Sequence, residues 1–224
     1  MKARSNALFR ARVRALAGLA LVIGLAGCSS TPPVPDWQMN AKGALERATA
    51  AWLEGNTRVA EAEFGRARAE ASRTGQVDVV ARVELTRCAA RVASLDLGAC
   101  EAFERLRVDA APPERAYADY LAARLAPSEA ARLPEQHRAV AGNPRALAQV
   151  TDPLAQLVAA GVVFAAGQAS PATVQTAVDT ASAQGWRRPL LAWLGLQAQL
   201  ADKAGDAESV ERVRRRIVLV EGGR

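Results

Sequence analysis

Residues 44–71 read ALERATAAWLEGNTRVAEAEFGRARAEA, and this stretch decides the fold class. Small and apolar side chains recur there every three or four positions, both before and after the central pair Gly55-Asn56. That period places one apolar face on a helix, and glycine commonly follows the last helical residue. The stretch therefore predicts two antiparallel helices joined by a short turn, whose alanine-rich faces allow the helices to approach closely.

The rest of the chain after residue 35 continues this period and lacks the strict alternation of β-branched and aromatic residues that predicts strands. Proline, glycine and capping residues mark where successive helices begin and end. The helices expected cover residues 37–53, 57–73, 76–94, 99–108, 112–125, 128–142 with a break at Pro134, 144–150, 153–167, 171–185, 189–205 and 206–221. The sequence thus predicts an all-α fold of antiparallel helical hairpins, with about nine or ten helices in all.

The segment 44–71 resembles a tetratricopeptide repeat. The family's small residue in the first helix and its turn glycine fall on Ala48 and Gly55. The family's second helix carries an alanine, an aromatic residue and another alanine, which here fall on Ala60, Phe64 and Ala67. The resemblance implies a tetratricopeptide-like array, in which stacked hairpins leave a concave surface where a peptide or a helix docks.

Further copies of this repeat are weaker. One places Phe103 on the aromatic position, and another lies within residues 198–217. Ala44 and Ala51 stand where the family often has tryptophan and tyrosine, and the copies do not follow the family's spacing of about 34 residues. A non-repetitive domain of antiparallel helices is therefore the alternative interpretation.

The N-terminus follows a different pattern. Residues 1–14 carry five basic side chains and no acidic one, and residues 15–26 are almost wholly apolar. This apolar run is too short for a transmembrane helix, which needs about 20 residues. We therefore interpret residues 1–27 as a secretory signal peptide.

The signal peptide ends in Leu25-Ala26-Gly27-Cys28, which resembles the bacterial lipobox. The resemblance implies cleavage between Gly27 and Cys28, and a covalent diacylglyceryl group and N-acyl chain on Cys28. Because Ser29 follows in place of aspartate, it also implies a lipid-anchored protein on the periplasmic face of the outer membrane. An ordinary signal peptide with an incidental cysteine is the alternative.

Removal of this leader changes the charge of the chain. The whole chain has a net charge of +6, but the residues after Gly27 hold 24 basic and 23 acidic side chains. The basic balance thus belongs to the leader, and a nucleic-acid partner is not expected. Residues 28–35 form a Pro/Ser-rich tether that spans roughly 25 Å when extended, and residues 36–224 form the helical repeat-like domain.

No pattern in the chain is typical of a catalytic site, a metal site or a cofactor site, so an enzyme is not expected. The single histidine, His137, lies in a stretch that we expect to be exposed. Neighbouring carboxylates on the helices are expected to be solvated and paired with arginines; these are Glu61, Glu63, Glu101 and Glu104. The alternatives are an envelope enzyme that uses Glu129, Glu135 or Asp152, and a carrier of a lipid or small ligand.

Two further features indicate contacts. Export places the chain in an oxidising compartment, and Cys88 and Cys100 flank one predicted turn at comparable distances, so we predict a disulfide between them. Two small buried thiols are the alternative. Trp186, Arg187 and Arg188 combine residue types that are enriched at binding hot spots, which makes them candidates for contact with a partner.

The sequence as a whole therefore predicts a non-enzymatic, lipid-anchored helical-repeat protein of the periplasm. We expect it to act as an adaptor or assembly factor that binds another envelope protein. Neither the identity of that partner nor its pathway follows from the residues.

Overall fold

The computed structural model describes residues 33–222, so the lipobox residues Leu25 to Cys28 lie outside the described part. The described residues contain only helices and connecting segments, which confirms the predicted all-α fold. They form ten α-helices and two short 3₁₀ helices. In this part of the chain no helix combines the length and the hydropathy needed to cross a membrane.

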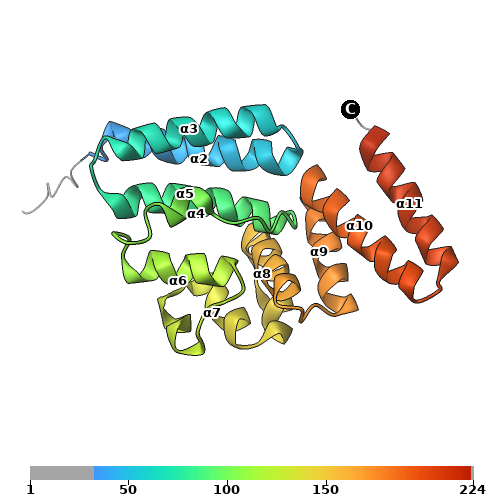
Figure 1. Ribbon diagram of the computed structural model, residues 1–224. Coiled ribbons are helices and arrows are strands. Elements are labelled where there is room, and N and C mark those ends of the chain that lie inside the picture. The colour runs from blue at the N-terminus through green and yellow to red at the C-terminus, as the bar shows by residue number, and fades with distance from the viewer. Residues whose placement is uncertain (1–32, 223–224) are drawn as a thin grey trace, which may run out of the picture. The chain divides into compact units, whose positions relative to one another are not determined.

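The helices follow one another with short connections (Figure 1). Their bounds are α2 Asp36–Glu54, α3 Thr57–Ser72, α4 Val77–Ala93, α5 Glu101–Glu104, α6 Pro112–Leu121, η1 Pro127–Arg132, α7 Glu135–Gly142, η2 Pro144–Gln149, α8 Pro153–Ala165, α9 Pro171–Ala183, α10 Arg187–Lys203 and α11 Ala207–Gly222.

Helices α2 and α3 form the antiparallel hairpin predicted from residues 44–71. Gly55 adopts a positive φ of 96° in the turn, a conformation that glycine adopts without steric cost. The side chain of Asn56 accepts a hydrogen bond from the backbone N–H of Val59, so Asn56 caps α3. Alanines line the buried faces of both helices, and their small size allows the close packing.

Helix α4 is the centre of the helical domain. It packs against α2, α3, α6 and α8, and ten of its 17 residues are buried. In Figure 1 it lies between the α2–α3 hairpin on one side and α6 with α8 on the other. Five short elements, α5 to η2, follow α4 in the chain. The next helix, α8, then packs against α4.

Helices α8 to α11 pack in chain order, each against the next. Asp152, Ser170 and Asp206 cap α8, α9 and α11 through hydrogen bonds to backbone N–H groups. Helix α10 begins at Arg187, two residues before the expected Pro189, because proline is tolerated in a first helical turn. Helix α10 also contacts α2, so the C-terminal helices pack against the N-terminal hairpin.

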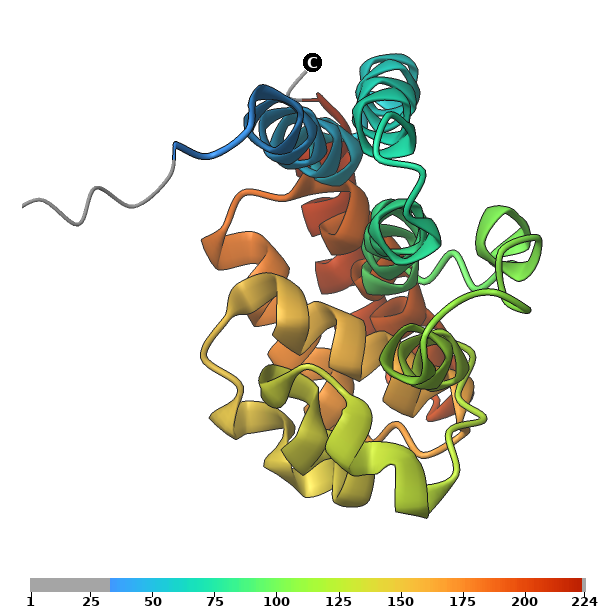
Figure 2. The same ribbon diagram turned by 90° about the vertical axis from the view of Figure 1, so that its left-hand side faces the viewer.

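The segment between α4 and α8 departs furthest from the sequence prediction. The helix expected over residues 99–108 is reduced to the single turn α5, and the helix expected over 112–125 ends at Leu121. Prolines at 127, 134 and 144 divide the remainder into η1, α7 and η2. Figure 2 shows these short pieces at one end of the helical domain.

Two residues of this fold, one on α10 and one on α8, hold α4 in place. Trp193 of α10 is fully buried, and its indole N–H donates a hydrogen bond to the carbonyl oxygen of Ala93 at 3.0 Å. That carbonyl belongs to the last turn of α4, where a helix leaves its carbonyls without partners of its own. Gly161 of α8 faces Val92 of α4 at the same end, and a Cβ at Gly161 would overlap the Val92 carbonyl.

The Gly161→Ala substitution tests this close approach. The added methyl group would overlap the Val92 carbonyl oxygen and lie 2.8 Å from Val92 Cγ1, so α8 has to move away from α4. We expect a loss of about 1–3 kcal/mol in the free energy of unfolding, measured by urea denaturation.

Gly65→Ala is the matched control, because Gly65 lies on the exposed side of α3 and a Cβ added there would meet no atom within 4 Å. The free energy of unfolding of Gly65→Ala should rise by about 0.5–1 kcal/mol, since alanine loses less conformational entropy in a helix than glycine does. Equal stability of the two variants would contradict the close approach.

Candidate functional site

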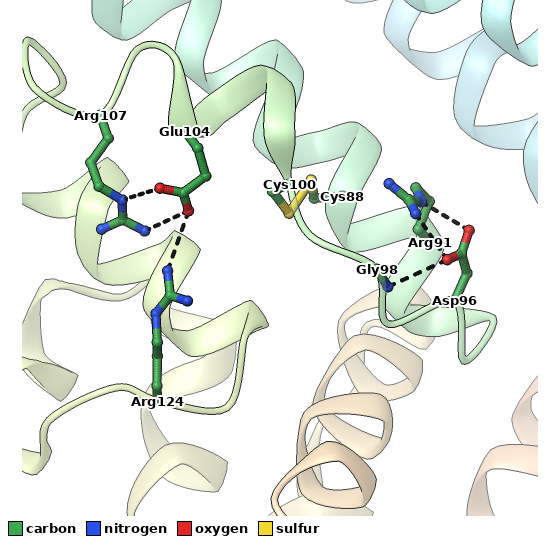
Figure 3. The surroundings of a disulfide bond; sticks show 8 residues. All are labelled: Cys88, Arg91, Asp96, Gly98, Cys100, Glu104, Arg107 and Arg124. Atoms are coloured by element: carbon green, nitrogen blue, oxygen red, sulfur yellow. Dashed lines mark hydrogen bonds and ion pairs between the residues drawn. A yellow bond between two sulfur atoms is a disulfide. The ribbon is translucent and has the colours of Figure 1, made fainter.

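The chain turns sharply after α4, and a disulfide spans that turn. The structure joins Cys88, in α4, to Cys100, directly before α5, with 5.9 Å between their Cα atoms (Figure 3). Cys88 is buried and Cys100 is half-buried. The bond therefore ties the start of the irregular segment to the central helix.

An ion pair fixes the same turn on the other side of the disulfide. The guanidinium of Arg91 donates to both carboxylate oxygens of Asp96, each at 2.9 Å, as Figure 3 shows. These hydrogen bonds hold the pKa of Asp96 below its ordinary value, since they favour the charged carboxylate. Leu95, between them, has a positive φ of 58°, so the two links hold a turn that leucine rarely adopts.

A second charged network links α5 to α6. Arg107 donates to Glu104 and to Asp119, and Arg124 donates to the same two carboxylates. The hydrogen bond from Arg107 is the main cause that lowers the pKa of Glu104. This network is structural: both carboxylates are neutralised by arginine, which leaves no acid or base with an unusual protonation state there.

Three buried glutamates form a series across the N-terminal half of the domain. Each accepts a hydrogen bond from an arginine of the preceding neighbour helix: Arg47 to Glu63, Arg68 to Glu84 and Arg82 to Glu114. The glutamate side chains are 9%, 4% and 7% exposed, whereas the arginines are 59%, 47% and 68% exposed. We call this series the arginine–glutamate ladder.

The burial of Glu63 in this ladder contradicts one expectation from the sequence. The sequence predicts a solvated Glu63, but this side chain is buried between α2 and α3 because Arg47 and Arg66 neutralise it there. A sequence signal for this burial does exist. Glu63, Glu84 and Glu114 occupy positions on the apolar stripe of their helices, where a charge requires a partner.

A groove of about 410 Å³ lies at the far end of this ladder. It is formed by α4, α6, η1 and α7, and we call it the α4–α6 groove. Its charged lining residues are Arg82, Glu114, Arg132 and Arg138, and its apolar walls include Leu85, Pro113, Tyr117, Leu133 and Pro134. Its volume is within the range of roughly 300–1,000 Å³ that is typical of ligand sites.

An aromatic cluster lies behind the groove. The ring of His137 packs on Tyr117 and Tyr120, with centroids 5.4 Å and 5.1 Å apart. The expectation that His137 is exposed is wrong, because α7 turns this side chain inward and leaves it 2% exposed. Burial lowers the pKa of His137 to about 4, so the imidazole is neutral at neutral pH.

The candidate partner-contact residues lie between helices of the domain. The Arg188 guanidinium stacks on the Trp52 ring at 4.0 Å and donates to the Trp52 carbonyl at 2.7 Å. Arg187 donates to the carbonyl of Val220, and Trp186 packs half-buried against the core. These side chains join α10 to α2 and α11, so they are committed to contacts within the chain.

The acids considered for an enzyme do not converge on a cleft. Glu135 and Asp152 are exposed, and Asp152 caps α8. Glu129 is half-exposed and forms an ion pair with Arg132. Within residues 33–222 no group of three or more histidine, cysteine, aspartate or glutamate side chains is arranged to hold a metal ion.

Comparison with known proteins gives no relative: no family model, no curated protein and no solved structure matches this chain. Function is therefore inferred from the chain's own residues. The two features that bear on it are the disulfide-tied turn and the α4–α6 groove.

Alkylation of the unreduced, denatured protein tests the disulfide. We expect peptide mapping by mass spectrometry to show Cys88 and Cys100 linked and unmodified by the alkylating reagent. Replacing both by alanine should lower the free energy of unfolding by about 3 kcal/mol, because the bond joins residues 12 positions apart and so closes a loop in the unfolded chain. Two alkylated thiols in the untreated protein would show the bond to be absent.

The free energy of unfolding, measured as a function of pH, tests the burial of His137. Its pKa is lower in the folded state than the ordinary value of 6.5, so protonation favours unfolding. The contribution of neutral His137 to the free energy of unfolding is therefore fully present above about pH 6.5, and it falls as the pH drops towards 4. Relative to His137→Phe, which keeps a ring but does not titrate, the wild type should lose about 2 kcal/mol between pH 7 and pH 5.

His137 is the chain's only histidine, so no other imidazole contributes to this difference. The measurement is urea denaturation of both proteins at each pH. Parallel stability profiles of the two proteins would mean that His137 is solvated.

Proposed function

We propose that this chain is a lipid-anchored protein of the outer membrane, on its periplasmic face, which binds another envelope protein as an adaptor or assembly factor. The observation that carries the proposal is the sequence Leu25-Ala26-Gly27-Cys28 after a basic and apolar leader. Lipids on Cys28 would anchor the chain stably, because stable attachment needs more than one acyl chain.

The Cys88–Cys100 disulfide supports the proposed compartment. Disulfides persist in oxidising compartments such as the bacterial periplasm and are rare in the cytosol. The bond lies in the helical domain, more than 50 residues after the lipobox, so it is independent of the leader.

The helical domain supports a binding role. It begins at Asp36, eight residues after Cys28, so the tether keeps it close to the membrane surface. Packed helices give a rigid surface, and the α4–α6 groove offers arginines beside apolar walls on that surface. Arginine and aromatic residues are enriched at protein interfaces, which suits a protein partner.

Metabolic labelling with a radioactive fatty acid tests the anchor. The wild-type protein should carry the label and sediment with outer membranes. Cys28→Ser should lose the label entirely and keep its leader, because the modified sulfur is required before cleavage. Ser29→Ala, the adjacent control, should label like the wild type; acyl label on Cys28→Ser would refute the lipobox interpretation.

Site-specific photo-crosslinking in intact cells addresses the partner. A photoreactive amino acid placed at exposed positions of α4, α6 and α7 should yield one protein adduct, repeated at neighbouring positions. The adduct should be lost in the unlipidated Cys28→Ser protein. The adaptor role fails if no exposed position of the lipidated protein gives an adduct.

A further inference from the structure

The arginines of the α4–α6 groove share one bonding pattern. The Nε of Arg82 donates to Glu114, that of Arg132 pairs with Glu129, and that of Arg138 donates to the Leu133 carbonyl. Within the described residues no bond is made by their terminal nitrogens. Each guanidinium is therefore fixed in orientation, while both of its terminal nitrogens remain available to a ligand.

Fixed guanidinium groups are suited to carboxylates and phosphates, because a planar fork donates two parallel hydrogen bonds to two oxygens. All three arginines are exposed on the surface, so a ligand reaches them without unfolding the domain. Their orientation is set before binding, which reduces the entropy lost when the ligand binds.

The apolar walls of the groove decide between the two kinds of anion. Leu85, Tyr117 and Pro134 line the groove beside the arginines. A peptide segment offers aliphatic groups to such walls as well as carboxylates, whereas inorganic phosphate offers no apolar surface. The Glu114 side chain is 7% exposed and its Oε1 accepts the bond from Arg82, so Glu114 acts as the partner of Arg82 and not as a contact for the ligand.

We propose that the α4–α6 groove binds an extended acidic peptide segment of a partner protein, whose carboxylates pair with Arg132 and Arg138. Leu85, Tyr117 and Pro134 give the walls against which the aliphatic parts of such a segment pack. The inference rests on the proposed adaptor function, since it assigns the chemistry of the partner.

Fluorescence anisotropy measures this binding. The protein is the full chain as purified in detergent micelles, whether or not it is lipidated, and the probe is a fluorescein-labelled octapeptide of alternating glutamate and alanine. The same peptide with glutamine in place of glutamate is the comparison. We expect the glutamate peptide to bind at least tenfold more tightly, because charge-assisted hydrogen bonds are far stronger than neutral ones.

Substitutions locate the site. Arg132→Ala and Arg138→Ala should each weaken the binding of the glutamate peptide about tenfold. Arg58→Ala is the control, since Arg58 is exposed on α3 outside the groove. It should bind as the wild type does, and thermal melts verify that every variant is folded.

Competition experiments distinguish binding of the peptide from binding of other anionic ligands. Inorganic phosphate and phosphatidylglycerol vesicles should displace the peptide only in large excess. Equal binding of the two peptides, unchanged binding by folded Arg132→Ala and Arg138→Ala, or stoichiometric displacement by phosphate or vesicles would each overturn the proposal. These readouts do not depend on acyl labelling or on crosslinking in cells, so failure here is distinct from failure of the proposed function.

Discussion

The crossing of α4 and α8 at Gly161 is the constraint on which the rest of the domain depends. Helix α4 holds the α2–α3 hairpin and α6, and α8 leads to α9, α10 and α11. Without a side chain on Gly161, the backbone of α8 lies against Val92 of α4. The hydrogen bond from Trp193 then satisfies the Ala93 carbonyl at the C-terminal end of α4, and it brings α10 to the same place.

The arginine–glutamate ladder fixes how the N-terminal helices are aligned. A buried carboxylate costs free energy unless it is neutralised and hydrogen-bonded, so Glu63 and Glu84 are stable only where Arg47 and Arg68 reach them. Faces lined only by alanine permit several alignments of two helices, because many positions present the same small side chain. We infer that the ladder selects one alignment among those that apolar packing permits.

Much of the fold was predictable from the sequence because helix ends depend on local residues. Caps such as Asp152 and Ser170 act on N–H groups within three positions, and the turn glycines end helices directly. The order of packing was not predictable, because α4 meets α8 across five intervening elements. The burial of His137 follows from that order and not from its neighbours in the chain.

The candidate site was missed for the same reason. Arg82, Glu114 and Arg138 are far apart in the sequence, and each by itself resembles a solvated charge on a polar helix face. Only the packing of α6 against α4, and of η1 against α6 and α7, brings them together. At the first step of the ladder, Glu63 has both oxygens bonded to arginines, whereas at the last step Glu114 keeps one oxygen without a partner. The ladder is thus complete at its first step and incomplete where it reaches the groove. Because Arg82 extends from the largely buried central helix, a segment bound there would contact a helix that is packed on several sides, as a precise binding site requires.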